Sequence, residues 1–518
     1  MKTTALFLLI TLSTFICQST LLAQDVTSPN TQELTEYLEK ARKEWQIPGM
    51  AVAVIADDEV IYQQGFGVGN IETGEKVTAE TIFGIASNTK AFTSAALAIL
   101  VDRKEISWDD PVQKYLPWFK LYDPYVSANI TIRDLLSHRS GLKTFSGDLI
   151  WYASAHSRRE ILERAQHLEP RYGFRERFGY SNIMYLAAGQ IVKAVTDTTW
   201  EDFVEHHLID PLKMERTSTS ITQLPEFSNV AQPHNQVDGK NVPISWVNWD
   251  NIAPAGGINS SVADMANWIR MQLNNGKWED QQLFSQTQSN QMWQPITSLP
   301  ISTHAQQRFP FIQWKAYGMG WNLHDFHGFK VVTHSGGLDG MISRVVMVPE
   351  KNLGFVLLTN NINGATSWLS YELLDRFLKT GSNDWSARGL DLQKNYEKRQ
   401  AEQKQAIEES RIPGTVPSLP LEAYTGTYHC KLYGEVEVSI KEEQLYLQFQ
   451  QTQLFESPLE HWHFDTFTLK FAQVPSLPEG WVQFSLNKEG EISGLSVDVP
   501  NPDFDFTEFT FIKQAGKK

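Results

Sequence analysis

The spacing of apolar residues divides the chain into a part with mixed helical and strand patterns and a later part with strand patterns alone. From Thr31 to about Ser386, apolar residues at helical spacing alternate with short β-type runs, and Gly, Pro and Asn separate them. Two of these runs, Met50–Ile55 and Val60–Phe66, are joined by turn-prone residues and predict a hairpin. The segment Ala91–Leu100 is apolar on nearly every side, which predicts a buried helix. We therefore expect a large α/β or α+β domain in this part of the chain.

The pattern changes towards the C-terminus. Residues 393–411 are rich in Lys, Glu and Gln at helical spacing, which favours a solvated linker helix that ends at Ile412-Pro413-Gly414. Beyond Leu421 apolar and polar residues alternate with period two, as in Val436–Ile440, and turn residues separate the runs. This pattern is typical of a small all-β unit, either a barrel or a curled sheet. The predicted boundaries are 24–386 for the first domain, 387–420 for the linker and 421–518 for the β domain.

The first two dozen residues have the pattern of a secretory signal peptide. Lys2 supplies a positive charge, and Ala5–Cys17 is an apolar run too short to span a bilayer. We place cleavage after Ala23, so residues 1–23 form the signal. A lipoprotein signal at Cys17 would need a small residue before the cysteine, and isoleucine stands there. The mature chain then keeps only Cys430 and forms no intramolecular disulfide.

Composition narrows the class of protein. The 518 residues carry a formal charge of −15, and no Lys/Arg-rich stretch offsets it locally, so nucleic acid is a poor partner for this chain. The length predicts two or three domains. After signal removal no apolar run reaches about 18 residues, so we expect no membrane span. These features predict a periplasmic or secreted bacterial protein.

Several catalytic motifs are missing from the sequence. It contains no G-x-S-x-G elbow, no H-E-x-x-H and no P-loop, and two cysteines cannot build a Cys-based metal site. Three serines, however, are followed three residues later by a lysine. Ser485 and Lys488 lie on an alternating strand, where these positions point to opposite faces. Ser140 and Lys143 lie in a glycine-containing loop, so no regular element fixes their geometry.

The third pair, Ser87 and Lys90, stands at the predicted start of the buried helix. On a helix these positions are neighbours on one face, so the lysine amine would lie beside the serine hydroxyl. Burial would push Lys90 towards its neutral form, which can accept the serine proton. The helix N-terminus would add N–H donors where an oxyanion develops. Taken alone, the pattern fits equally well a serine that only caps the helix.

At this point the sequence resembles the serine β-lactamase and penicillin-binding-protein superfamily, in its class C-like branch of D-aminopeptidases, DD-peptidases and esterases. The resemblance depends on three segments in the same order and spacing as in that family. They are Phe83-Gly84-Ile85-Ala86-Ser87-Asn88-Thr89-Lys90, Tyr180-Ser181-Asn182 and His334-Ser335-Gly336. It implies an antiparallel sheet flanked by helices, and the C-terminal part resembles the lipocalin-like barrels appended to some relatives.

The resemblance also implies roles for individual residues. Ser87 would attack a carbonyl, and Lys90 with the Tyr180 phenol would relay its proton to the leaving group, with no metal or organic cofactor. The backbone N–H groups of Ser87 and Gly337 would form the oxyanion hole. Asn182 would hold Lys90 and the substrate amide. His334, with the adjoining Gly336 and Gly337, would meet the substrate.

The third segment departs from the Lys-Thr-Gly of β-lactamases. A literal Lys379-Thr380-Gly381 does occur, but it follows a helical run, where Gly381 is expected to be a helix stop. His334 has the preceding strand and the following glycines. We therefore expect a peptidase or esterase rather than an efficient β-lactamase, and a buried structural histidine is the alternative.

The sequence thus predicts an exported serine hydrolase that cleaves an amide or ester bond in a peptide with D-residues, a small ester or a β-lactam. Two alternatives stay open: a penicillin-binding sensor or scaffold that acylates without efficient turnover, and an α/β-hydrolase-type esterase that would use another serine. The pattern identifies no acidic residue as a deacylation base. It also leaves open whether the β domain binds a ligand, caps the site or drives homo-oligomer formation.

Overall fold

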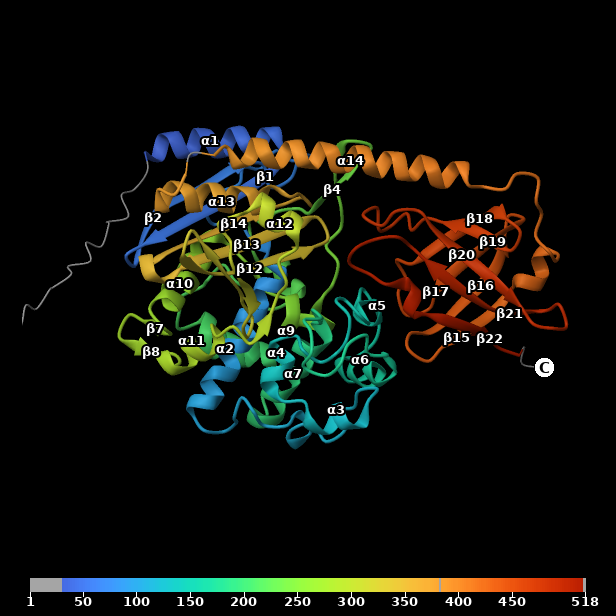
Figure 1. Ribbon diagram of the computed structural model, residues 1–518, viewed down its shortest axis with the longest axis horizontal. Coiled ribbons are helices and arrows are strands. Elements are labelled where there is room, and N and C mark those ends of the chain that lie inside the picture. Colours follow the sequence, from blue (N-terminus) through green and yellow to red (C-terminus); the bar gives the residue numbers. More distant parts are fainter. Residues whose placement is uncertain (1–29, 382, 516–518) are drawn as a thin grey trace, which may run out of the picture.

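A computed structural model describes residues 30–381 and 383–515 of the chain. The predicted signal segment, residues 1–23, lies outside the described residues. The described chain forms a mixed α/β part and a closed β-barrel beside it, as expected (Figure 1). No helix among the described residues is long and apolar enough to cross a membrane.

The α/β part is built around an antiparallel sheet in the order β2-β1-β14-β13-β12-β11-β10-β9. Its strands are β1 (Gly49–Ala56), β2 (Glu59–Gly67), β9 (Thr297–Ser298), β10 (Lys315–Tyr317), β11 (Asn322–Phe326), β12 (Phe329–Leu338), β13 (Met341–Val348) and β14 (Leu353–Thr359). Two-residue to four-residue strands form three small ribbons: β3 (Phe83–Gly84) with β6 (Asn259–Ser260), β4 (His234–Val237) with β5 (Lys240–Pro243), and β7 (Lys277–Trp278) with β8 (Gln281–Gln282).

The predicted hairpin is formed by β1 and β2. Its turn residues Asp57 and Asp58 both have positive φ, 50° and 66°. Two consecutive left-handed residues give the turn that matches the twist of a two-stranded ribbon, and aspartate tolerates this conformation better than most residues.

Helices cover both faces of the sheet. Alternate residues of β1 point to opposite sides, so Val52 and Val54 pack with α1 (Thr31–Glu44) and α13 (Ala365–Leu378), whereas Ala51 and Ala53 belong to the core shared with α2 (Thr89–Asp102). The apolar sequence of α2 is buried as predicted. The other helices are α3 (Pro124–Asn129), α4 (Ile132–Leu136), α5 (Asp148–Trp151), α6 (Arg158–Arg164), α7 (Asn182–Thr196), α8 (Trp200–Val204), α9 (Ala253–Gly256), α10 (Val262–Leu273), α11 (Gln286–Met292) and α12 (Thr303–Arg308).

The linker helix α14 (Trp385–Glu409) runs from the sheet to the barrel (Figure 1). It begins earlier than its charged segment suggested, because Trp385 and Gly389 pack against Trp368 of α13. Between the two helices Lys379, with φ 54°, ends α13 in a left-handed conformation. The predicted stop at Gly381 is therefore two residues too late.

The C-terminal β domain is a closed, antiparallel barrel in which each strand pairs with the next and the first pairs with the last. Its strands are β15 (Gly426–Cys430), β16 (Gly434–Lys441), β17 (Gln444–Phe449), β18 (Glu456–His463), β19 (Thr466–Leu469), β20 (Gly480–Leu486), β21 (Ile492–Asp498) and β22 (Thr510–Lys513). Alternating apolar residues point inwards, and aromatic rings such as Phe455, Phe471 and Phe506 pack against one another.

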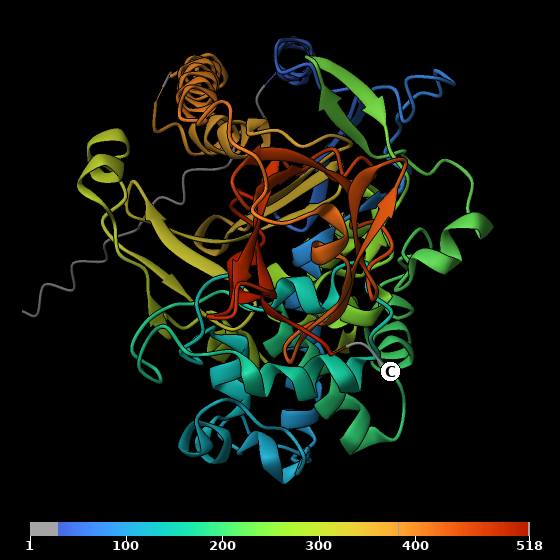
Figure 2. The same ribbon diagram turned by 90° about the vertical axis from the view of Figure 1, so that its right-hand side faces the viewer.

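The barrel packs against the segment from Lys143 to Arg164 of the α/β part (Figure 2). Lys143 forms an ion pair with Asp505 of the barrel, and the N–H of Gly147 donates to Glu508 Oε2 at 2.8 Å. Further contacts join Ala155 N to Gln451 O, His156 to Tyr433 O and Arg164 to Leu432 O. These contacts position the barrel beside the loops that lead into α5 and α6.

Candidate active site

Ser87 lies in a 3-10 turn, Ala86–Asn88, that connects β3 to α2. The preceding Ala86 has φ 45°, a conformation that L-residues rarely adopt and that costs of order 1 kcal/mol. The N-cap of α2 is Asn88, whose side chain instead donates to Ser343 Oγ at 2.8 Å. Ser87 is therefore not the helix cap, and the strained turn presents its hydroxyl to a pocket.

Lys90 lies directly beneath Ser87 and is fully buried. Its Nζ is 3.0 Å from Ser87 Oγ, 2.7 Å from Asn182 Oδ1 and 2.8 Å from the carbonyl oxygen of Ala255. Burial lowers the pKa of Lys90 well below its usual value, and the charge of Asp148 partly opposes that change. A neutral amine has two hydrogens and one lone pair. Two carbonyl-type acceptors therefore take the hydrogens, and the lone pair is left for the Ser87 hydroxyl.

Tyr180 covers this pair from the pocket side. Its ring centroid is 4.7 Å from Lys90 Nζ, and the His138 ring packs against it at a tilt of 36° with a centroid separation of 4.3 Å. Burial raises the pKa of the Tyr180 phenol well above its usual value, and a hydrogen bond to Ser87 opposes that rise. His138 Nδ1 accepts a hydrogen bond from the N–H of Ser181 at 3.1 Å, so this histidine holds the Tyr180 loop in place.

Asp148, the first residue of α5, extends the network beyond Lys90. Asn182 Nδ2 donates to Asp148 Oδ2 at 2.6 Å, and Trp151 Nε1 donates to Asp148 Oδ1 at 2.9 Å. Burial raises the pKa of Asp148 to about 7, although both hydrogen bonds lower it. Asn182 therefore links a buried lysine to a buried acid. Sequence reasoning missed Asp148, because α5 has only four residues and no motif surrounds it.

His334 lies on β12 and forms part of the pocket wall. Its Nδ1 is 2.6 Å from the carbonyl oxygen of Ser335, and its Nε2 is 2.9 Å from the Tyr317 hydroxyl. Because a carbonyl only accepts, Nδ1 carries the hydrogen and Nε2 accepts from Tyr317. Burial and the nearby Lys90 lower the pKa of His334 to about 3, so the ring is neutral. Tyr317, on β10, is a second residue that sequence reasoning missed.

The two glycines after His334 let β12 approach the nucleophile turn. A Cβ on Gly336 would lie 2.2 Å from the carbonyl oxygen of Ile85 and 2.9 Å from the backbone nitrogen of Ser87, so only glycine fits there. Gly337 is exposed and lines the pocket.

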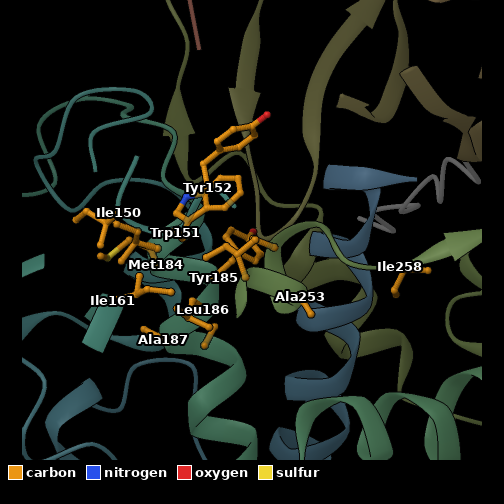
Figure 3. Packing of buried hydrophobic residues seen from close by; sticks show 14 of the residues in the cluster. Ile150, Trp151, Tyr152, Ile161, Met184, Tyr185, Leu186, Ala187, Ala253 and Ile258 are labelled. Atoms are coloured by element: carbon orange, nitrogen blue, oxygen red, sulfur yellow. The ribbon is translucent and has the colours of Figure 1, made fainter. Parts of the chain in front are cut away.

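The structure brings the predicted residues together around one pocket of about 480 Å³. Ser87, Tyr180, Asn182, His334 and Gly337 line it, Lys90 lies beneath its floor, and Gly336 lies behind its wall. The aromatic residues Trp151 and Tyr152 also line the pocket and belong to the hydrophobic core (Figure 3). The barrel also contributes lining residues: Ser476, Leu477, Asn501, Pro502, Asp503 and Phe504.

Comparison with known proteins gives the family. The sequence profile of the family described as Beta-lactamase matches residues 34–370, and a domain of unknown function (DUF3471) matches residues 410–513. The chain belongs to the β-lactamase family. The family match spans the nucleophile turn, the Tyr180 loop and β12, which are the segments that carry the predicted site.

Relatives of this β-lactamase-family chain include hydrolases. It is 28% identical over 446 residues to the unguisins hydrolase ungD' of Aspergillus campestris, with 81% of this chain and 80% of the relative covered. It is also 28% identical to the protein flp of Staphylococcus aureus, with 65% and 64% covered.

Two solved structures share the fold. The octameric penicillin-binding protein homologue from Pyrococcus abyssi has a TM-score of 0.60 at 22% identity and covers 94% of this chain and 100% of its own. The crystal structure of SurE has a TM-score of 0.54 at 18% identity and covers 93% and 99%. At these identities the likeness concerns the fold.

Proposed function

We propose that this protein is an exported serine hydrolase that cleaves an amide or ester bond through an acyl-Ser87 intermediate. The observation that carries the proposal is the buried Lys90, whose Nζ is 3.0 Å from Ser87 Oγ and whose other contacts are two oxygen acceptors. This arrangement favours a neutral amine that accepts a proton from the serine. The hydrolase names among the relatives support the same class of reaction.

Acylation begins with attack of Ser87 Oγ on the substrate carbonyl carbon, while the hydroxyl proton passes to Lys90 Nζ. The N–H groups of Ser87 and Gly337 stabilise the oxyanion of the tetrahedral intermediate. The intermediate collapses when its C–N or C–O bond breaks. The proton on Lys90 passes through the Tyr180 phenol to the leaving nitrogen or oxygen, and acyl-Ser87 remains.

Deacylation is the same sequence with water as the nucleophile. Water attacks the acyl carbonyl, and one of its protons passes through the Tyr180 phenol to Lys90 Nζ. The ester bond to Ser87 Oγ then breaks, and that oxygen recovers the proton. Asn182 and Asp148 hold Lys90 in place during both steps through hydrogen bonds of 2.7 and 2.6 Å.

The charge and the hydrogen bonds of His334 favour some classes of substrate over others. Where a lysine in this segment would present a positive charge to a substrate carboxylate, His334 is neutral and uses both ring nitrogens within the protein. A small ester or a peptide with D-residues is therefore a better substrate proposal than a β-lactam. Export is proposed from residues 1–23 alone.

Steady-state and burst kinetics with p-nitrophenyl acetate test the proposal. We expect a burst of p-nitrophenol equal to the enzyme concentration, followed by turnover. Ser87→Ala should abolish both, and Lys90→Ala should slow acylation by roughly 100-fold or more. Ser485→Ala, which changes the serine of another Ser-x-x-Lys pair, is the matched control and should keep full activity. Turnover that survives in Ser87→Ala would contradict the proposal.

A further inference from the structure

A second cavity lies beside the active-site pocket. Its volume is about 920 Å³, roughly twice that of the pocket around Ser87. Tyr152, Asp339 and Ser476 line both cavities, so the second one adjoins the first. Cavities that hold small ligands have volumes of about 300–1,000 Å³, and the second cavity is near the upper end of that range. We name it the side groove.

One wall of the side groove is the β4–β5 hairpin. His234 of β4 points away from the groove, and its Nδ1 is 3.0 Å from the carbonyl oxygen of Asn360. Neighbouring residues of a strand point to opposite faces, so Asn235 and Val237 point into the groove. Val242, the cross-strand partner of Asn235, lies on the same face. The two valines are 37% and 41% exposed, so the hairpin presents apolar surface to the groove.

The barrel forms another wall. Leu454 and the segment Val474-Pro475-Ser476, which lies between β19 and β20, line the groove. The hairpin lies beside the barrel in Figure 2, where its green strands adjoin orange and red ones. The loop that leads from β5 to α9 adds Trp246 and Val247. The walls are therefore largely apolar.

Two amide side chains in the groove have atoms without a hydrogen bond. Asn235 is 4% exposed, and its Nδ2 has no partner among the described residues. Asn251 Nδ2 donates to the carbonyl oxygens of Trp151 and Ser154 at 2.8 and 3.3 Å, which fixes the direction of this amide. Its buried Oδ1 has no partner in the same part of the chain. Buried amide atoms are nearly always paired, and a peptide backbone offers both an acceptor and a donor.

The side groove favours an uncharged ligand. No lysine or arginine lines it within residues 30–381 and 383–515. Its two acids are used within the protein. Asp250 accepts hydrogen bonds from Ser220 Oγ and from the N–H of the following residue, and Asp339 accepts from the Tyr152 hydroxyl and the Trp249 side chain. A charged side chain in the groove would therefore lack a free partner of opposite charge.

The position of Tyr180 indicates which part of a substrate reaches the groove. In the proposed mechanism the Tyr180 phenol protonates the leaving group, so the leaving group faces Tyr180 and the acyl part points the other way. The oxyanion hole includes the N–H of Gly337, and Asp339 follows two residues later, just after the end of β12. Because Asp339 lines the groove, an acyl chain that continues past the oxyanion hole along β12 enters it.

We propose that the side groove binds the acyl part of a peptide substrate, a segment of two or more uncharged, apolar residues that precedes the scissile bond. Asn235 and Asn251 bind the backbone of this segment, and Val237 and Val242 contact its side chains. The inference depends on the hydrolase proposed above and names its substrate class: an extended, apolar peptide rather than a small ester.

Substrates of different acyl length test the groove. The p-nitrophenyl ester of N-acetyl-D-alanine is compared with that of N-acetyl-leucyl-valyl-D-alanine, and the rates of Ser87→Ala are subtracted as background. We expect kcat/KM to rise by about tenfold or more in the longer ester, the gain from burying one apolar side chain. The N-acetyl-seryl-seryl-D-alanine ester should lie between the two, because it keeps the backbone and lacks the apolar side chains.

An alkyl chain distinguishes a peptide site from a site for a fatty acyl group. The p-nitrophenyl octanoate ester has apolar surface and no peptide groups, so its gain over p-nitrophenyl acetate should be smaller than the gain of the leucyl-valyl ester. An octanoate gain equal to or larger than the peptide gain would overturn the peptide assignment.

The variants assign the preference to residues. Val237→Ser and Val242→Ser should each reduce the gain of the leucyl-valyl ester to about a third or less, since each removes apolar contact area. Val60→Ser is the matched control, because Val60 is a 40% exposed valine on β2, outside both cavities. Asn235→Asp keeps the shape and removes the donor, so it should reduce the peptide gain about threefold and leave the octanoate-to-acetate ratio unchanged.

The outcomes separate this inference from the function on which it depends. Wild-type enzyme that hydrolyses p-nitrophenyl acetate through Ser87 but treats short and long peptide esters alike would overturn the groove and leave the hydrolase standing. Unchanged ratios in all three groove variants would do the same. Absence of any Ser87-dependent turnover would overturn both proposals.

Discussion

Replacing Asp148 with asparagine tests how the buried network controls Lys90. Asp148 accepts hydrogen bonds from Asn182 Nδ2 and Trp151 Nε1, so both of its oxygens are used. An asparagine has one oxygen, and in either orientation one of these N–H donors faces an amide nitrogen. If Asn182 turns over in response, its nitrogen replaces its oxygen beside Lys90 Nζ, and the 2.7 Å hydrogen bond is lost.

The expected loss follows from that one hydrogen bond. Leaving a buried partner unsatisfied costs about 1–3 kcal/mol, which corresponds to a roughly 5- to 150-fold fall in kcat/KM. The variant also removes a negative charge that favours protonated Lys90. The pKa of Lys90 should therefore fall, and the acidic limb of the pH profile of kcat/KM should move to lower pH in either orientation of the new amide.

The assay is p-nitrophenyl acetate hydrolysis from pH 5 to 9, with thermal unfolding measured on the same samples. Asp264→Asn is the matched control, because Asp264 is a buried acid on α10 whose hydrogen bonds go to Arg216 N and Thr217 Oγ1, away from the pocket. Activity of Asp148→Asn within twofold of the wild type, with an unmoved acidic limb, would refute the role given to the network.

Three further changes are expected to have measurable effects. Gly336→Ala places a Cβ 2.2 Å from the carbonyl oxygen of Ile85, so β12 must move away from the nucleophile turn by roughly 1 Å. We expect kcat/KM to fall roughly 100-fold while circular dichroism stays native, and near-normal activity would contradict the tight contact. Tyr317→Phe leaves His334 Nε2 without its hydrogen-bond donor. Urea titration should therefore show a loss of about 1–3 kcal/mol in the free energy of unfolding. An unchanged free energy of unfolding would mean that the Tyr317–His334 hydrogen bond is not formed. Burial raises the pKa of Asp264 to about 6, above its unfolded value near 3.9, so the folded state binds more protons between about pH 4 and 6. The free energy of unfolding should therefore fall as pH rises through that window, and Asp264→Asn should remove this part of the fall. Parallel plots of unfolding free energy against pH for the two proteins would contradict the prediction.

The parts of the site that depend on local geometry were predictable from sequence. Ser87 and Lys90 lie one helical turn apart, and their meeting requires only a helix at that point, although the first turn is 3-10 and Ser87 does not cap it. The β1–β2 hairpin and the buried α2 follow from periodicity in the same way. The resemblance of three short segments placed Tyr180 and His334 at the same site.

The parts that depend on tertiary contacts were not predictable. Asp148 reaches Asn182 from the short helix α5, and Tyr317 reaches His334 because β10 and β12 flank β11. Asp503 enters the pocket through the packing of a separate barrel, about which the local pattern of alternating residues carries no information. Sequence periodicity describes what each element buries, and it does not describe which loops meet.

Intact-mass spectrometry with a fluorophosphonate and, separately, a penicillin tests the nucleophile most directly. The wild-type chain should gain one phosphonyl group, peptide mapping should place it on Ser87, and Ser87→Ala should gain none. A penicillin adduct that forms and then decays would agree with a hydrolase, whereas one that persists without turnover of any ester would favour a sensor. A phosphonyl group on a serine other than Ser87, or its absence from the wild-type chain, would contradict the acyl-enzyme mechanism.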